Sequence, residues 1–246
     1  MSQLTLNQVT DAEIADSNWK SLYKLGGAAA LMGVLVGLSE IIITFLPGGG
    51  VSSGAETVVD WFTLFQNHWF LGLRNLGLLN IVLTALAIPI FFALYAAHRR
   101  TNQAYAALAM IIAFIGIATF FATNRAFPML ELSRQYAAAT TDAQRSMIAA
   151  AGQAMLSVGQ SHTPGTFIGF LLTEVAGIVI SMVMLRSQVF DKATAYAGVL
   201  GFGLLLIFEV CSSFVPALGV AMLFAMGGGL LSMAWYILVA RRLFQL

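Results

Sequence analysis

The sequence predicts an all-α, polytopic membrane protein with six transmembrane helices and an extracytoplasmic cap of amphipathic helices. Of its 246 residues, 59% are hydrophobic and only 9% are charged, whereas soluble globular domains carry about 25% charged residues. A chain this poor in charge cannot cover a water-facing surface, so lipid must be its main solvent. Because one span needs about 20 apolar residues, the length accommodates six spans and their connections.

Six apolar runs have the length of a membrane span, and Pro or Gly residues punctuate the chain around several of them. The predicted spans cover residues 23–46, 71–97, 104–122, 165–185, 194–215 and 218–240. Residues 1–22 are polar and are expected to form a cytoplasmic N-terminal tail. The six-helix membrane domain is therefore predicted to cover residues 23–246.

Two segments between the spans are too polar to cross a membrane. Residues 53–70 mix Trp61, Phe62 and Trp69 with polar side chains, which is typical of an interfacial helix because Trp favours the headgroup level. Residues 124–163 form the longest polar connection, and within them Thr141-Asp142-Ala143-Gln144 matches a capping box that begins a helix. These two segments make up the predicted cap.

The basic residues predict the orientation. Eight of the twelve Lys and Arg fall on one side under this topology: Lys20, Lys24, Arg99, Arg100, Arg186, Lys192, Arg241 and Arg242. The positive-inside rule then predicts cytoplasmic N- and C-termini for a multi-pass protein of the cell membrane. The net charge of +1 indicates no nucleic-acid partner. The expected partners are membrane lipid and other membrane-protein subunits, and no cofactor is indicated.

Charged and polar residues gather in the outer halves of the predicted spans, where burial of a charge in lipid is costly. This predicts an outward-facing polar cluster as the ligand-binding site. Its members are Glu40, Arg74, Asn80, Arg125, Glu174 and Glu209. Glu174 is the first choice for a functional residue because its side chain is short and its position in the fourth span is deep.

Three interpretations of this cluster remain open: ion pairs that hold the bundle together, a ligand cavity, and catalysis. The leading hypothesis is a non-enzymatic protein that binds a lipid or other small amphiphile, or an accessory subunit of a membrane complex. One alternative is an intramembrane metal-dependent hydrolase with His68 and His162 as weak candidate ligands, although no HxxxH, HExxH or ExxH spacing occurs. Another is a proton- or ion-coupled carrier that uses Glu174.

Several local strings together resemble a known family. They are Leu22–Leu31 (LYKLGGAAAL), Asp60–Asn67 (DWFTLFQN), Tyr136–Met147 (YAAATTDAQRSM), Ala150–Met155 (AAGQAM), Met184–Ser187 (MLRS), Lys192–Tyr196 (KATAY) and Ala240–Leu246 (ARRLFQL). The chain resembles, over nearly its whole length, a bacterial family of small multi-pass membrane proteins catalogued as domain of unknown function 4386. The resemblance implies a similar length and span count and a bacterial inner-membrane setting. It brings no activity, substrate or catalytic residue.

Overall fold

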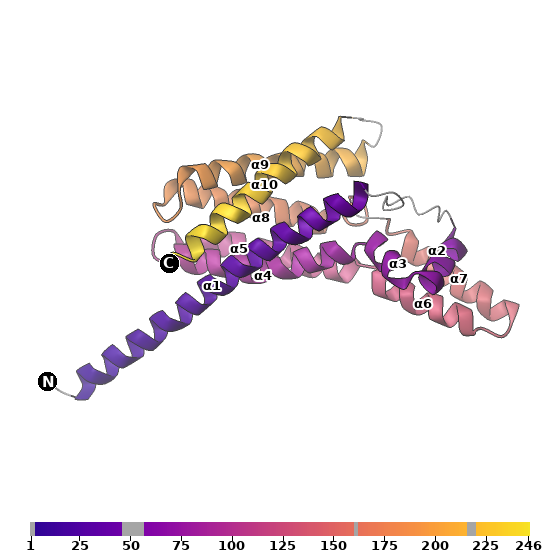
Figure 1. The fold of residues 1–246 in the computed structure, drawn as a ribbon, viewed down its shortest axis with the longest axis horizontal. Helices are drawn as coiled ribbons and strands as arrows, with labels where there is room; N and C mark the ends of the chain where they lie inside the picture. Colours follow the sequence, from indigo (N-terminus) through magenta and orange to yellow (C-terminus); the bar gives the residue numbers. More distant parts are fainter. Residues whose placement is uncertain (1–2, 46–56, 160–161, 216–219) are drawn as a thin grey trace.

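The computed structural model describes residues 3–45, 57–159, 162–215 and 220–246. In these ranges the chain folds into helices joined by turns, with no strand (Figure 1). The helices are α1 (Gln3–Phe45), α2 (Val58–Asn67), α3 (Trp69–Asn75), α4 (Leu78–His98), α5 (Gln103–Thr123), α6 (Ala126–Ala138), α7 (Asp142–Leu156), α8 (Phe167–Arg186), α9 (Lys192–Phe214) and α10 (Ala221–Leu243).

Six helical segments in the described ranges are long and apolar enough to cross a membrane. They lie in α1 (Trp19–Ile43), α4, α5 (with the adjoining α6), α8, α9 and α10. Many large apolar side chains on them remain exposed, including Leu200 at 56% and Leu230 at 67%, which suits surfaces that face lipid. The predicted fold class and the six spans are confirmed.

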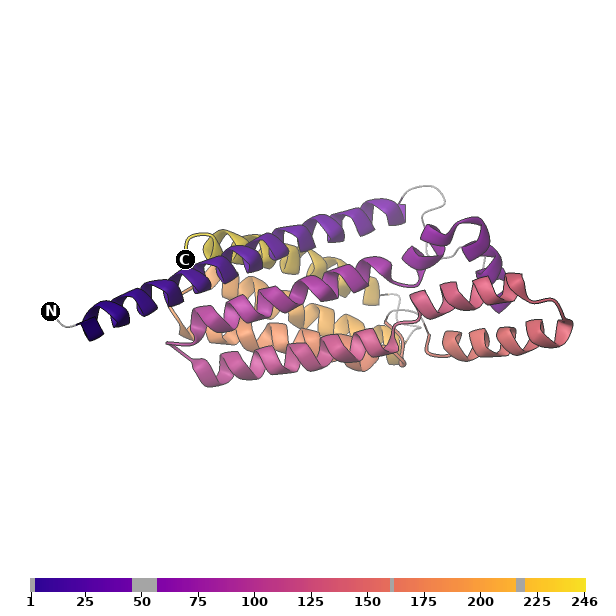
Figure 2. The ribbon, with the colours of Figure 1, turned by 90° about the horizontal axis from the view of Figure 1, so that it is seen from below.

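The six spanning helices pack in the order in which they occur in the chain. Each of α4, α5, α8 and α9 packs mainly on the spans that precede and follow it, and α10 closes the ring against α1. The bundle is therefore a sequential up-and-down arrangement (Figures 1 and 2). The C-terminus and the N-terminal part of α1 lie at one end, called the termini end below, and α2, α3, α6 and α7 lie at the opposite cap end.

Three helix boundaries differ from the sequence prediction. Helix α1 begins at Gln3, so the predicted tail is helical, continuous with the first span, and projects beyond the bundle (Figure 1). The second span begins at Leu78 rather than 71, because Gly77 adopts φ 95° and separates α4 from the short helix α3. The predicted interfacial helix 53–70 ends at Asn67, and its residues 53–56 lie outside the described ranges.

The cap is a small helical layer with its own apolar core. Trp61 and Phe62 on α2 are buried with Leu73 on α3 and Met129 on α6. The Ser133 hydroxyl on α6 donates a 2.9 Å hydrogen bond to the Phe62 carbonyl oxygen. Thr57 caps α2 together with Asp60, and the predicted capping box of Thr141 and Gln144 is present at the start of α7.

The main apolar core of the bundle is concentrated towards the termini end. It includes Ala30 of α1, Leu94 of α4, Met184 of α8 and Trp235 of α10, all fully buried. Nearer the cap end, several of the most buried residues are polar or charged: Arg74, Asn75, Arg125, Thr166, Glu209 and Ser213. Buried charged side chains therefore lie towards the cap end, while the termini half also buries polar His98, Ser181 and Thr194.

Candidate functional site

A histidine and a glutamate side chain are in hydrogen-bond contact at the cap end of the bundle. Nδ1 of His162 lies 2.5 Å from Oε2 of Glu209, whose side chain is only 2% exposed. Glu209 lies about one and a half turns before the end of α9, and the Ser213 hydroxyl one turn later donates a 3.4 Å hydrogen bond to its Oε1. Both carboxylate oxygens of this buried acid therefore have partners, as a charge in this setting requires.

The backbone and its neighbours hold His162 in place against Glu209. His162 has a φ of 62°, a left-handed conformation uncommon for a residue with a side chain. The Ser212 hydroxyl donates a 2.9 Å hydrogen bond to its carbonyl oxygen. Its ring packs against Phe170 of α8 and Phe208 of α9, with centroid separations of 4.4 and 4.9 Å. A local conformation maintained against its own preference is typical of functional sites.

Glu174 brings a second carboxylate towards this pair. It lies two turns into α8, close enough to Glu209 and to Tyr236 of α10 for electrostatic interaction. Its Oε2 is buried and accepts no hydrogen bond. Glu174, Glu209 and His162 form what we call the acidic cluster, with Tyr236 beside it. Two carboxylates and one imidazole leave this region negatively charged whenever both acids are ionised.

Two further polar side chains lie between the same helices, nearer the termini end. The Ser181 hydroxyl of α8 and Trp235 Nε1 of α10 are fully buried and have no hydrogen-bond partner. Both lie against Gly198 of α9, where a methyl group would meet the Ser181 hydroxyl and would come within 2.6 Å of Trp235 Nε1. The interfaces of α8, α9 and α10 therefore carry polar groups from the acidic cluster into the termini half.

The remaining residues of the predicted cluster fall into other arrangements. Arg74 of α3 pairs with Glu40 of α1 at 3.1 Å and also donates a 3.1 Å hydrogen bond to the side-chain oxygen of Asn75. This pair ties the first span to the cap. Arg125, between α5 and α6, is 3% exposed and its Nε has no hydrogen-bond partner. Asn80 is half-buried near the start of α4.

The two candidate metal-ligating histidines lie in different settings. His68 is exposed at the break between α2 and α3, whereas His162 pairs with Glu209. Within the described ranges, no group of three or more His, Cys, Asp or Glu is placed to hold a metal ion.

The sequence does not indicate that His162 belongs to the acidic cluster or that Tyr236 lies beside it. His162 appeared there only as a weak metal ligand, because its partner Glu209 is 47 residues away in the chain. Tyr236 lies in an apolar helix, and its position beside Glu174 follows only from the packing of α10. No spacing rule links residues that meet across three different helices.

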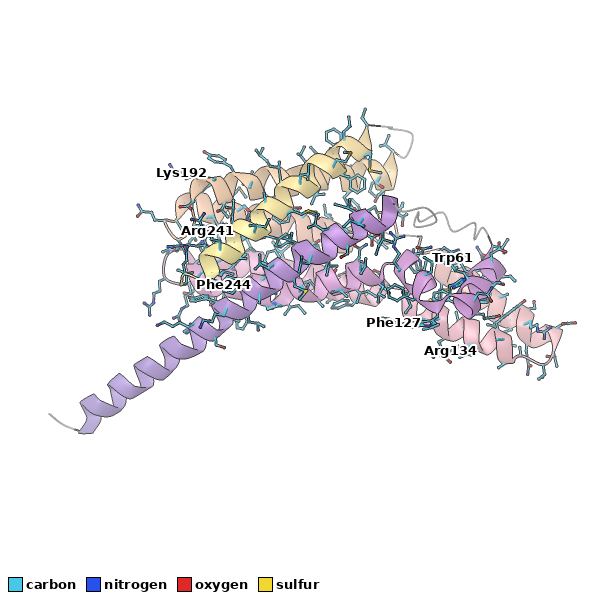
Figure 3. All side chains as sticks on the ribbon, in the orientation of Figure 1. Trp61, Phe127, Arg134, Lys192, Arg241 and Phe244 are labelled. Carbon is cyan, nitrogen blue, oxygen red and sulfur yellow. The ribbon has the colours of Figure 1, made fainter. Side chains whose placement is uncertain are left out.

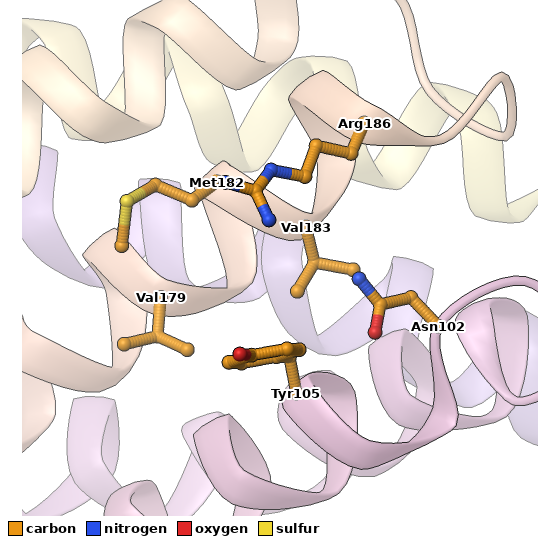
Figure 4. Close-up of a pocket in the computed structure, with 6 residues that line it drawn as sticks. All are labelled: Asn102, Tyr105, Val179, Met182, Val183 and Arg186. Carbon is orange, nitrogen blue, oxygen red and sulfur yellow. The ribbon is translucent and has the colours of Figure 1, made fainter.

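Two pockets lie at the termini end. One of about 150 Å³ lies between α5 and α8, where Asn102 and Tyr105 face Val179, Val183 and Arg186 (Figure 4). The other, about 230 Å³, lies between α1 and α4 beside the last residue of the chain and includes Trp19, Arg99 and Arg100. Both place cationic groups at the ends of spans, the level at which lipid headgroups meet a membrane protein.

The fold and this arrangement of side chains define the class of the molecule as a polytopic, helical membrane protein with titratable residues inside its bundle. Comparison with family models, curated proteins and solved structures gives no match. The chemistry of the molecule is therefore argued below from its own residues.

Proposed function

We propose that this is a non-enzymatic membrane protein that binds a cationic amphiphile at the acidic cluster in exchange for a proton. The observation that carries the proposal is the buried Oε2 of Glu174, which accepts no hydrogen bond although it lies near Glu209. A buried carboxylate without a partner is unfavourable, so this group requires either a proton or a cation. Glu209 and His162 already satisfy each other, which leaves Glu174 as the group available to a ligand.

Aromatic rings around the cluster favour an organic cation over a small metal ion. Phe170 and Phe208 lie against His162, and Phe120 packs edge-on against Phe170 at 5.4 Å. Such rings bind apolar groups and attract cations through their faces. A ligand with a positive charge and apolar substituents would satisfy both the carboxylate and the rings, whereas a hard metal ion prefers several oxygen ligands.

Equilibrium binding of tetraphenylphosphonium to the purified full-length protein in a non-ionic detergent tests the proposal. We expect saturable binding that weakens as the pH falls, because protons compete for the same carboxylates. Binding should release protons into a weakly buffered solution. Glu174→Gln, which preserves the shape of the side chain, should weaken binding at least about tenfold, as expected when a charge-assisted contact worth about 1.4 kcal/mol or more is lost.

Glu131→Gln is the matched control, because Glu131 lies on the cap helix α6 with 58% of its side chain exposed. This variant should bind tetraphenylphosphonium as the unaltered protein does. Equal binding by Glu174→Gln and the unaltered protein, or no binding above that of empty detergent micelles, would exclude the proposal.

A proton-coupled carrier is the second candidate function, and it is favoured by the closeness of the two carboxylates Glu174 and Glu209. A site that binds either a proton or a cation can couple their movements if it opens to both sides of the membrane. In proteoliposomes, a pH gradient should then drive uptake of tetraphenylphosphonium, and Glu174→Gln should abolish this coupling. An uptake rate that Glu174→Gln leaves unchanged would remove the carrier hypothesis.

An accessory-subunit role is supported by apolar side chains that the cap exposes, such as Met147 at 71% and Phe127 at 52%. Native mass spectrometry after gentle extraction would reveal a retained protein partner. The metal-dependent hydrolase hypothesis gains no such support, since the described residues place no three metal ligands together.

We further propose that both termini face the cytoplasm. The support is electrostatic, because Lys192 and Arg241 lie at the termini end whereas Arg134 lies in the cap (Figure 3). Green fluorescent protein fused to the C-terminus should then be fluorescent, and alkaline phosphatase fused there should be inactive. The opposite results would mean that the C-terminus faces the outside of the cell. The strings quoted above resemble the family catalogued as domain of unknown function 4386, and on that resemblance we propose common ancestry with it and a bacterial inner-membrane setting.

A further inference from the structure

A pocket at the termini end is lined by cationic and aromatic side chains. It has a volume of about 230 Å³. Its charged side chains are Lys20 at the start of the first span and Arg99 and Arg100 at the end of α4, and Trp19 and Tyr23 add aromatic rings. Leu246 also lines the pocket.

The three cations of this pocket have no acidic partner among the described residues. Within the described ranges, none of Lys20, Arg99 and Arg100 takes part in an ion pair. The Arg99 guanidinium instead lies 4.1 Å over the ring of Trp19, which orients it without neutralising it. Cationic groups held together without an acidic side chain form a site with a net attraction for an anion.

Apolar surface continues from the pocket along the span. The Trp19 ring packs edge-on against Phe92 at 6.4 Å, and Phe92 is itself 41% exposed on the outer surface of α4. Leu25 of α1 is 57% exposed about one and a half turns further along the first span. The cationic pocket thus adjoins a surface suited to acyl chains, with Trp19 at the boundary between the two.

We infer that this pocket binds the phosphate-bearing headgroup of an anionic phospholipid, with Lys20, Arg99 and Arg100 around the phosphate and an acyl chain along Phe92. A free anion would use the charges but not the adjoining apolar surface. A zwitterionic phospholipid carries a choline or ethanolamine cation that the three basic residues repel. The site is separate in sequence and position from the acidic cluster, so it does not rest on the proposed function.

Native mass spectrometry of the full-length protein, titrated with phosphatidylglycerol or phosphatidylcholine of matched acyl chains, tests the inference. We expect the unaltered protein to retain phosphatidylglycerol preferentially. Lys20→Gln/Arg100→Gln removes two cations from exposed positions, where substitutions usually change stability little. Each basic residue near an anionic lipid surface raises the affinity about fivefold. The double variant should therefore bind phosphatidylglycerol about 25-fold more weakly.

Arg134→Gln/Arg145→Gln is the matched control, because it removes the same charge from exposed positions in the cap. It should retain phosphatidylglycerol unchanged. Trp19→Leu should weaken retention independently of charge, because Arg99 then loses the ring that orients it. Equal retention of the two lipids, an equal loss in the cap control, or displacement of the lipid by excess inorganic phosphate would each overturn the inference.

Discussion

Nδ1 of His162 lies 2.5 Å from Oε2 of Glu209, and this pair joins the segment that precedes α8 to the last turns of α9. His162 belongs to a tight turn in which the Thr163 hydroxyl donates a 3.3 Å hydrogen bond to the Val158 carbonyl oxygen. The pair therefore fixes how the chain enters the bundle from the cap. It also places the Glu209 carboxyl inside the bundle, within electrostatic range of Glu174.

Loss of the imidazole should destabilise the protein more than loss of both partners. His162→Ala leaves the buried Glu209 carboxyl without its imidazole partner, and because His162 is one-third exposed we expect a cost of about 1–3 kcal/mol. In His162→Ala/Glu209→Gln the unpartnered carboxyl is replaced by an amide that cannot carry a charge, so thermal stability in detergent should be partly restored. A double variant less stable than His162→Ala would contradict this account of the pair.

Gly198 should tolerate no side chain, whereas Gly203 on the same helix should. A methyl group at Gly198 would collide with Ser181 and Trp235, while one at Gly203 would meet nothing within 4 Å. We expect Gly198→Ala to lower stability by about 1–3 kcal/mol through overpacking. Gly203→Ala should leave the melting temperature unchanged or raise it, since Ala favours helix. Equal melting temperatures for the two variants would show that α8, α9 and α10 do not pack as described.

The ion pair between Glu40 and Arg74 should stabilise the junction of the first span with the cap. The Arg74 side chain is 2% exposed, and Glu40→Gln would remove the carboxylate 3.1 Å from it. We expect a loss of about 1–3 kcal/mol. The comparison is Glu131→Gln, whose partner Arg134 lies 3.9 Å away on an exposed helix face, where the loss should stay below about 0.5 kcal/mol. Equal losses of stability in Glu40→Gln and Glu131→Gln would mean that the buried pair contributes no more than the exposed one.

The sequence predicts the spans well because each is set by local composition. Runs of apolar residues identify a membrane helix without reference to any partner, and the capping box at Thr141 and Gln144 involves residues only three apart. The boundary at Leu78 was missed for a conformational reason: the apolar run continues through Gly77, and only the positive φ of that glycine ends one helix before the next.

The candidate site is less predictable because it depends on which helix faces meet. Depth along a span can be read from the sequence, so Glu40, Glu174 and Glu209 were expected at similar levels. Rotation about the helix axis cannot be read in the same way when all faces are apolar. The expected single cluster is thus divided: Glu40 pairs with Arg74 at the cap, whereas Glu174 of α8 and Glu209 of α9 lie within electrostatic range of each other.

Arg125 should weaken rather than strengthen the fold. It is 3% exposed, its Nε has no hydrogen-bond partner, and no ion pair in the described ranges includes it. A buried guanidinium without a counter-charge loses its hydration and gains no Coulombic compensation. Arg125→Met has nearly the same length and no charge, so we expect it to raise stability by about 1 kcal/mol or more in thermal unfolding. A lower melting temperature would instead show that Arg125 stabilises the protein through an anion bound at the junction of α5 and the cap.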